Sequence, residues 1–301
     1  MTRDEIQTHQ VDRPTVSRPH RRERAALIAL FLMGAGPACR HKSGEDSGEP
    51  GAACVSSDLC DCGASYDGAG TVWPTIQAGL AALPGDDTLY ICPGMHWESL
   101  IVGEDTNPNY PLDSTMTLMG GSAGDTFISS MLEGPVLAIY GVNLDISALK
   151  ITGGMGSRGG SSEDDPIDDT VGGGIVDESP GLTLNDVVLR SNTADYGGGM
   201  VVANAYGSDY PHVTLTNCSI LANIAHAPSG TPGGGGVDLE SDQYLLQSIN
   251  TDWGDGADDN TPDDIDAPIV ESGALEETAY NYGAAASFTC SSETGTCVDD
   301  D

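Results

Sequence analysis

An acidic segment near the carboxyl end contains side chains that could bind a metal ion. Seven of the fifteen residues 252–266 are Asp, and Gly, Asn and Pro lie among them. Carboxylate oxygens are preferred ligands of calcium, and these small residues permit tight turns. The segment therefore predicts a calcium site with five ligands: Asp252, Asp255, Asp258, Asp259 and Asp263. Because no Glu closes the segment as in an EF-hand, a solvated acidic loop is the alternative interpretation.

The eight cysteines are typical of an exported protein, because disulfides persist in oxidising compartments. Cys290 and Cys297 lie close together in the sequence and are predicted to form a disulfide. Cys218 occupies an apolar position of the repeat described below, which predicts a buried free thiol. A zinc site at Cys60 and Cys62 is disfavoured, because only one residue separates them. The sequence leaves open how four others pair: Cys54, Cys60, Cys62 and Cys92.

The amino terminus has the layout of a secretory signal. A basic cluster precedes apolar and small residues over positions 25–36, and Ala38 and Cys39 follow. The small residues before Cys39 resemble the end of a bacterial lipoprotein signal, which implies removal of residues 1–38 and lipidation of Cys39. Plain cleavage after Ala38 is the alternative. Residues 39–53 are polar and rich in Gly and Glu, as in a flexible tether.

These features predict a lipoprotein of the outer membrane or cell surface, or alternatively a periplasmic or extracellular protein. The chain has 46 Asp and Glu against 11 Lys and Arg, and its net charge is −35. Such a surface repels nucleic acids, anionic membranes and polyuronates unless cations bridge the contact. We therefore expect no nucleic-acid partner, and contact with a membrane only through the lipid anchor.

A repeat in the second half of the chain predicts how the elements are arranged. Its pattern is apolar-x-apolar-x-x-apolar-x-apolar-x-x-Asn/Gly, and each half alternates with the period of a strand that buries one face. The terminal Asn or Gly is expected to adopt the left-handed conformation at a corner. Four copies follow this pattern: residues 144–154, 182–192, 213–223 and 244–254.

Glycine runs between the repeats introduce a third short strand in each unit. They occur at residues 172–174, 197–199 and 233–236. A unit with three strands buries its apolar face only when neighbouring units stack, which predicts a parallel β-helix over residues 54–254. We expect Leu184, Leu215 and Leu246 to lie one above another. A β-sandwich is the alternative, and residues 255–301 are expected to form an acidic loop and a carboxyl-terminal cap.

The rhythm "GGGMVV…VTLTNCSILANIA…GGGGV" resembles the exported right-handed parallel β-helix repeat proteins of the pectate-lyase-like superfamily. Residues 75–95 are similar to the amino-terminal cap and first coil of that group. Apolar residues at helical spacing after a possible N-cap at Thr75 also predict a short capping helix. The expected fold class is all-β: a right-handed single-stranded parallel β-helix, three short strands per coil, with an amino-terminal capping helix.

The resemblance implies glycan cleavage as the commonest activity of the group, but the catalytic set is incomplete. Asn250-Thr-Asp252 and Asp258-Asp259 match two segments of the polygalacturonase-like members, whereas the Gly-His-Gly and Arg-x-Lys segments are missing. Residues 120–124 fit G-x-S-x-G, yet no helical periodicity follows them. We therefore expect a non-catalytic surface protein that binds carbohydrate or another cell-surface polymer. A calcium-assisted polysaccharide lyase or glycoside hydrolase is the alternative.

Overall fold

The computed structural model describes most of the chain after the predicted tether. The signal over residues 1–38, the lipidation of Cys39 and the tether over residues 39–53 lie outside the described residues. All described residues belong to one of two compact units, Cys39–Asp301. They are residues 64–66, 72–83, 86–103, 114–156, 172–203, 211–226, 233–240, 243–271, 274–292 and 296–300.

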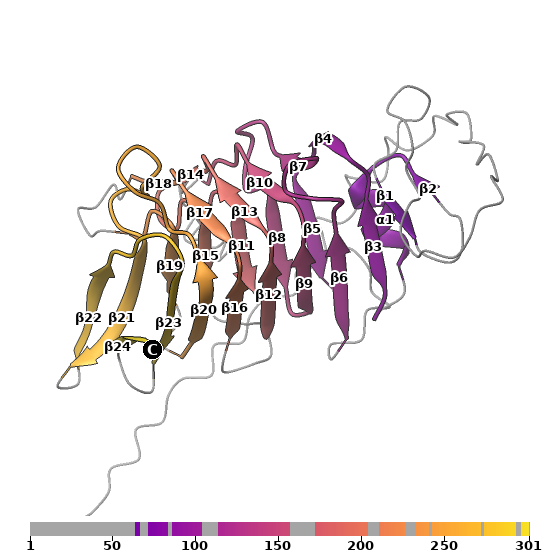
Figure 1. Cartoon of the computed structure of the whole chain (residues 1–301). Coiled ribbons are helices and arrows are strands. Elements are labelled where there is room, and N and C mark those ends of the chain that lie inside the picture. Colours follow the sequence, from indigo (N-terminus) through magenta and orange to yellow (C-terminus); the bar gives the residue numbers. More distant parts are fainter. Residues whose placement is uncertain are drawn as a thin grey trace, which may run out of the picture. The chain divides into compact units, whose positions relative to one another are not determined.

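The chain forms an all-β structure built on three sheets of parallel strands (Figure 1). The parallel part of sheet A contains β3 (Thr88–Ile91), β6 (Thr115–Met119), β9 (Asn143–Ser147), β12 (Gly181–Asn185), β16 (His212–Thr216) and β20 (Leu245–Thr251). Sheet B contains β4 (Gly94–Trp97), β7 (Thr126–Ser129), β10 (Lys150–Thr152), β13 (Val188–Arg190) and β17 (Ser219–Leu221). The parallel part of sheet C contains β5 (Leu100–Gly103), β8 (Leu137–Tyr140), β11 (Ile175–Glu178), β15 (Met200–Val202), β19 (Val237–Leu239) and β21 (Ile265–Glu271).

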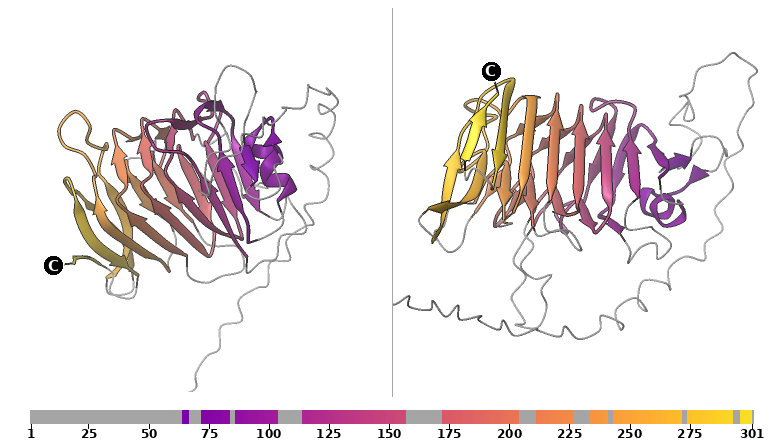
Figure 2. Two further views of the ribbon diagram at one scale, coloured as in Figure 1. Left: turned by 45° about the vertical axis from the view of Figure 1, so that its right-hand side comes forward. Right: turned by 90° about the horizontal axis from the view of Figure 1, so that it is seen from below.

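The chain passes through sheets A, B and C in turn, so that each of five circuits adds one strand to each sheet, and a last circuit adds β20 to sheet A and β21 to sheet C. We call one circuit a coil. Strands of successive coils lie side by side in sequence order (Figure 2). A small additional sheet pairs β14 (Thr193–Ala194) with β18 (Ile224–Ala225) at the corner between sheets B and C. The prediction of stacked three-strand units with parallel sheets is therefore confirmed.

The apolar positions of the repeat point into the stack. Leu184 lies opposite Leu215, as predicted, and both are fully buried. Leu246, however, lies opposite Val213, and Ser248 lies opposite Leu215, so the predicted position of Leu246 was wrong by two residues.

The size of Trp253 accounts for this shift in the last copy of the repeat. Its fully buried side chain lies in the stack, and its Nε1 donates a hydrogen bond to the Oγ of Ser248 at 3.3 Å. Two small inward residues, Ser248 and Thr251, leave space for the indole, whereas Ile249 is 39% exposed. The apolar pattern alone suggested a register with Ile249 inward, which the structure does not adopt.

The corners also differ from the sequence-based expectation. The left-handed residues at the second corner are Gly153, Ser191 and Ala222, with φ of 65°, 57° and 51°. Each precedes the terminal position of the repeat. The expectation that Asn192 and Asn223 would be left-handed was therefore wrong, because their side chains are needed in the interior.

Three buried asparagines form a ladder of side-chain amides through the stack: Asn192, Asn223 and Asn260. Asn192 Nδ2 donates to Asn223 Oδ1 at 3.1 Å, and Asn223 Nδ2 donates to Asn260 Oδ1 at 3.0 Å. Their Nδ2 groups also donate to the carbonyls of Ile151, Leu189 and Ile220. The ladder thereby satisfies polar groups that would otherwise be costly to bury.

The glycine runs pass through the most crowded part of each coil. A Cβ on Gly198 would lie 2.6 Å from the carbonyl oxygen of Gly235 and 2.6 Å from the amide nitrogen of Ile224. Only glycine fits this approach of three backbone segments. The periodic glycines of the sequence thus mark where consecutive coils touch.

A short helix closes the amino-terminal end of the stack, as predicted. Helix α1 (Ile76–Ala82) begins at Thr75, whose Oγ1 accepts a hydrogen bond from the amide of Ala78 at 3.1 Å. The carboxylate of Glu98 accepts from the amides of Ile76 and Gln77 at the same helix end. Strands β1 (Ala64–Tyr66) and β2 (Val72–Trp73) extend sheet A in the antiparallel sense.

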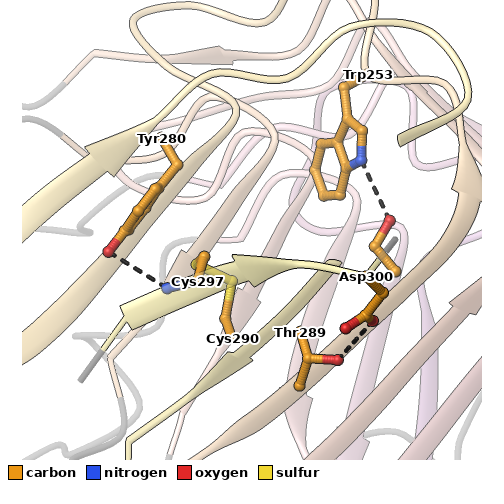
Figure 3. The surroundings of a disulfide bond; sticks show 7 residues. Trp253, Tyr280, Thr289, Cys290, Cys297 and Asp300 are labelled. Carbon is orange, nitrogen blue, oxygen red and sulfur yellow. Dashed lines mark hydrogen bonds between the residues drawn. A yellow bond between two sulfur atoms is a disulfide. The ribbon is translucent and has the colours of Figure 1, made fainter. Parts of the chain in front are cut away.

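Antiparallel strands close the other end. Strand β23 (Ala286–Ser291) pairs with β20, and β24 (Thr296–Asp299) pairs with β23. Strand β22 (Ala274–Tyr280) pairs with β21 and ends sheet C. The Cys290–Cys297 disulfide joins β23 to β24 (Figure 3), and the amide of Cys297 donates to the hydroxyl of Tyr280 at 3.4 Å. Cys218 is free and buried, as predicted.

Candidate functional site

The five predicted calcium ligands are spread along the acidic loop rather than gathered around one point. Asp252 Oδ1 accepts from the amide of Gly254, Asp258 Oδ1 accepts from Arg190 Nη2 at 2.6 Å, and Asp263 Oδ1 accepts from Asn281 Nδ2. Asp255 and Asp259 are exposed. Within the part of the chain that the structure describes, no three His, Cys, Asp or Glu side chains converge as metal ligands do.

The backbone of the acidic loop has a structural role instead. Ser219 and Asp252 form a parallel bridge, and the amides of Ile220 and Ala222 donate to the carbonyls of Asp252 and Asp258. The loop therefore covers β17, the last strand of sheet B, so that its backbone groups are paired. This role explains the turn-forming residues of the loop, while calcium binding stays a prediction from the sequence.

The candidate site is the outer face of sheet A. One row of residues on this face follows the strands in register, so that each member lies beside the next: Thr117, Asp145, Thr183, Thr214 and Gln247. They occupy the x positions between the apolar residues of each strand, and alternation directs them away from the core. We call these five residues the polar row.

The side chains of the polar row are available to a ligand. The structure gives none of these five described side chains a hydrogen-bond partner within the protein. Four members are half-buried by their neighbours, and Gln247 is exposed. Neighbouring strands lie about 4.8 Å apart, so the row presents hydroxyl, carboxylate and amide groups at regular intervals on a rigid support.

Polar residues continue on both sides of the polar row. Asn185 lies between Ser147 and Thr216, two residues further along the strands than the polar row and therefore at the next outward position. On the other side, the Oδ1 of Asn143 lies 2.9 Å from where a Cβ of Gly181 would be, so the side chain of Asn143 covers that glycine. The outer face of sheet A is thus a broad polar surface rather than a single line of groups.

Carboxylates are scarce on this face. Between β3 and β20, Asp145 is the one Asp or Glu that points outward from the parallel strands of sheet A. Glycoside hydrolysis ordinarily uses two carboxyl groups on opposite sides of the scissile bond. Asp252 and Asp258, which match the hydrolase segments, contact Gly254 and Arg190 instead.

Two buried carboxyl groups have shifted pKa values, and both lie away from the outer face of sheet A. Asp177 lies inside the stack between Ile139 and Val202, and burial raises its pKa to about 7. Its Oδ1 accepts from the amide of Ser179 at 3.0 Å. Burial also raises the pKa of Asp264 to about 6, although its carboxylate accepts from Asn260 Nδ2 and from the amide of Tyr282.

The sequence contained a signal for the polar row that the apolar pattern did not use. The x residues of successive copies include Asp145, Thr183 and Thr214 at equivalent positions. A stacked repeat places equivalent positions side by side, so a polar residue that recurs there indicates a surface row. The same signal does not identify Gln247, because the last copy of the repeat lies two residues away from its predicted register.

No family model matches the chain, and neither a curated protein nor a solved structure does. Among the described residues, no helix is both long and apolar enough to span a membrane.

Proposed function

We propose that this protein is a non-catalytic, exported surface protein that binds a neutral glycan on the outer face of sheet A. The observation that carries the proposal is the polar row, whose five side chains have no hydrogen-bond partner within the protein. Sugar hydroxyls both donate and accept hydrogen bonds, and Thr hydroxyls and the Gln amide do the same. A flat support held by backbone ladders loses little entropy when it orders a ligand.

The finer fold assignment is part of the proposal. We infer that the three-sheet stack is a right-handed parallel β-helix, because connections between parallel strands of one sheet are right-handed in nearly all proteins. The resemblance of its glycine and asparagine rhythm to pectate-lyase-like proteins supports the same assignment. Export of the protein would place its ligand outside the cytoplasm. The proposal of export is supported by the signal-like residues 1–38 and by the Cys290–Cys297 disulfide.

Charge favours a neutral ligand. The net charge of the chain is −35, and the polar row itself contains Asp145. A polyuronate would be repelled at long range and would meet a carboxylate at the site. A neutral polysaccharide has no such penalty, and Asp145 could accept hydrogen bonds from its hydroxyls.

Affinity electrophoresis through gels containing neutral or acidic polysaccharides tests the proposal. We expect retardation by at least one neutral polymer and none by polygalacturonate. Replacing Thr183 and Thr214 together by Val keeps their shape but removes two hydroxyls, and should weaken binding by about tenfold or more. Thr152→Val on sheet B is the matched control and should bind as the unmodified protein does.

Two results would overturn the proposal. One is binding that is insensitive to the Thr183→Val and Thr214→Val pair. The other is release of reducing ends or unsaturated products, with or without added calcium, which would favour the lyase or hydrolase alternative. Both assays use the same protein preparation.

A further inference from the structure

The sheets of the stack end in different ways at the amino-terminal side. In sheet A, β1 pairs with β3. In sheet C, the side chain of Gln77 takes the place of a further strand: its Nε2 donates to the carbonyl of Ile101 at 3.0 Å, and its Oε1 accepts from the amide of Ile101 at 2.8 Å. On this side of the first coil, β3 therefore has a neighbouring strand, and Ile101 of β5 has a side-chain partner for its backbone groups.

Strand β4 is the first strand of sheet B and has a neighbour on one side only among the described residues. The amides of Gly94 and Glu98 donate to the carbonyls of Asp125 and Ser129 at 2.7 and 2.9 Å, towards β7. Backbone direction alternates along a strand, so the N–H and C=O groups of Met95 and Trp97 point to the opposite, open side. No described residue bonds to them there.

The side chains of the same two residues are exposed. Met95 is 45% exposed and Trp97 is 58% exposed, the latter an unusual value for so large an apolar group. An edge strand with unpaired backbone and apolar side chains is a template for pairing with another strand. Natural proteins usually protect such edges with charges or proline, and β4 has neither.

The absence of charge on β4 indicates which partner fits. Two copies of a chain with net charge −35 repel each other over most of their surfaces. Strand β4 contains no Asp or Glu, and the carboxylate of the adjacent Glu98 is engaged by the amides of Ile76 and Gln77. This edge is therefore a place where two copies can approach with little repulsion.

We propose that two copies of this chain associate through antiparallel pairing of β4 with β4. A two-fold axis would place Met95 and Trp97 of each copy against the same residues of the other, as in isologous dimers. The two sheets B would then form one continuous sheet, with the apolar side chains of Met95 and Trp97 buried at the join. This inference does not depend on glycan binding by sheet A.

Sedimentation velocity over a range of protein concentrations, at physiological salt, tests the proposal. We expect a monomer–dimer equilibrium. Met95→Pro should weaken dimerisation by about tenfold or more, because it removes the amide that faces the open side while the bonds from Gly94 and Glu98 to β7 remain. Trp97→Glu should do the same by adding a charge at the join. Val298→Glu alters a similarly exposed apolar residue on β24, in the carboxyl-terminal cap, and serves as the control.

Circular dichroism and thermal melting establish whether each variant is folded. If Met95→Pro does not fold, Trp97→Glu still tests the proposal. Hydrogen exchange of the Met95 and Trp97 amides should slow as concentration rises. A monomer at all concentrations would overturn the proposal, as would a dimer that tolerates both variants. Exchange protection that is independent of concentration would show that another segment of the same chain covers β4, which also overturns it.

Discussion

The outer faces of sheets A and B belong to the same coils yet have opposite chemistry. Across sheet A the polar row presents hydroxyl, carboxylate and amide groups. Across sheet B the equivalent row contains three apolar residues, one basic residue and one hydroxyl: Met95, Phe127, Val188, Lys150 and Ser219. Of the residues that the structure describes, the only Lys and Arg are Lys150 and Arg190, and both lie on sheet B.

This difference separates what the fold requires from what it leaves free. Inward positions of both sheets are mostly aliphatic, because the stack is thin and each coil must bury them against the next. Outward positions have no such constraint, so their composition can differ from one face to the next. The two proposals above place ligand binding on sheet A and self-association on sheet B.

The largest expected effect comes from breaking the core that both faces share. Leu184→Ala should lower the free energy of unfolding by about 2–5 kcal/mol, because it leaves a cavity at a fully buried position between coils. Urea denaturation measures this change. Thr183→Ala, the outward neighbour on the same strand, is the control and should change the free energy by less than about 0.5 kcal/mol. Equal losses in both variants would contradict the assignment of inward and outward faces.

Asp177 extends the comparison to the interior of sheet C, where one carboxyl group interrupts an aliphatic column. Its pKa is about 7 in the folded protein and 3.8 ordinarily, so the folded state keeps a proton that the unfolded chain releases between these values. Stability should therefore fall as pH rises from 4 to 7, by about 1.4 kcal/mol per unit of pKa shift.

Asp177→Asn should remove this loss and stabilise the protein at pH 8 by a few kcal/mol, because a neutral amide can still accept from Ser179. Thermal melting between pH 4 and pH 8 measures the effect, and a smaller dependence should remain from Asp264, whose pKa is about 6. A variant that is no more stable than the unmodified protein at pH 8 would mean that the fold does not raise the pKa of Asp177.

A smaller effect is expected from one of the two basic residues of sheet B. Lys150 Nζ lies 5.7 Å from the centroid of the Phe127 ring, within the range of a cation–π contact. Lys150→Ala should lower the free energy of unfolding by about 0.5–1 kcal/mol. Urea denaturation measures this change, with Thr152→Ala as the control. A loss no greater than that of the control would mean that the contact between Lys150 and Phe127 does not stabilise the fold.

The smallest effect on stability is expected on sheet A itself. Thr214→Val keeps the shape of a half-buried side chain that has no internal hydrogen bond, so the melting temperature should barely change, with a free-energy difference below about 0.5 kcal/mol. Glycan retardation should nevertheless decrease. A large loss of stability would mean that the hydroxyl serves the fold, and the contrast between the two faces would then weaken.

The sequence was most informative where packing alone decides the structure. Alternating apolar residues placed Leu184 and Leu215 correctly, because only one register buries them. The same pattern predicted the wrong register around residues 244–254, where the side chain of Trp253 needs the space above Ser248. That need depends on side-chain volume in three dimensions, which the periodicity of the sequence does not contain. It also mistook Asn192 and Asn223 for corner residues, because a buried amide ladder and a left-handed turn favour the same residue type.

The candidate site was harder to anticipate for a related reason. A row of polar groups on a sheet is assembled from one residue per coil, about thirty residues apart along the chain, and no local motif marks it. The acidic loop drew attention because its carboxylates are adjacent in sequence. In the structure its backbone covers β17, and its side chains make separate contacts.

The asparagine ladder gives consecutive coils the same internal contact. Asn192 and Asn223 occupy the same place in consecutive coils, and each contacts the next asparagine through the same amide geometry. Duplication or loss of the gene segment for one whole coil would again place equivalent asparagines next to each other. Both caps would stay intact. The length of this molecule is thus open to evolution in discrete steps without redesign of the interior.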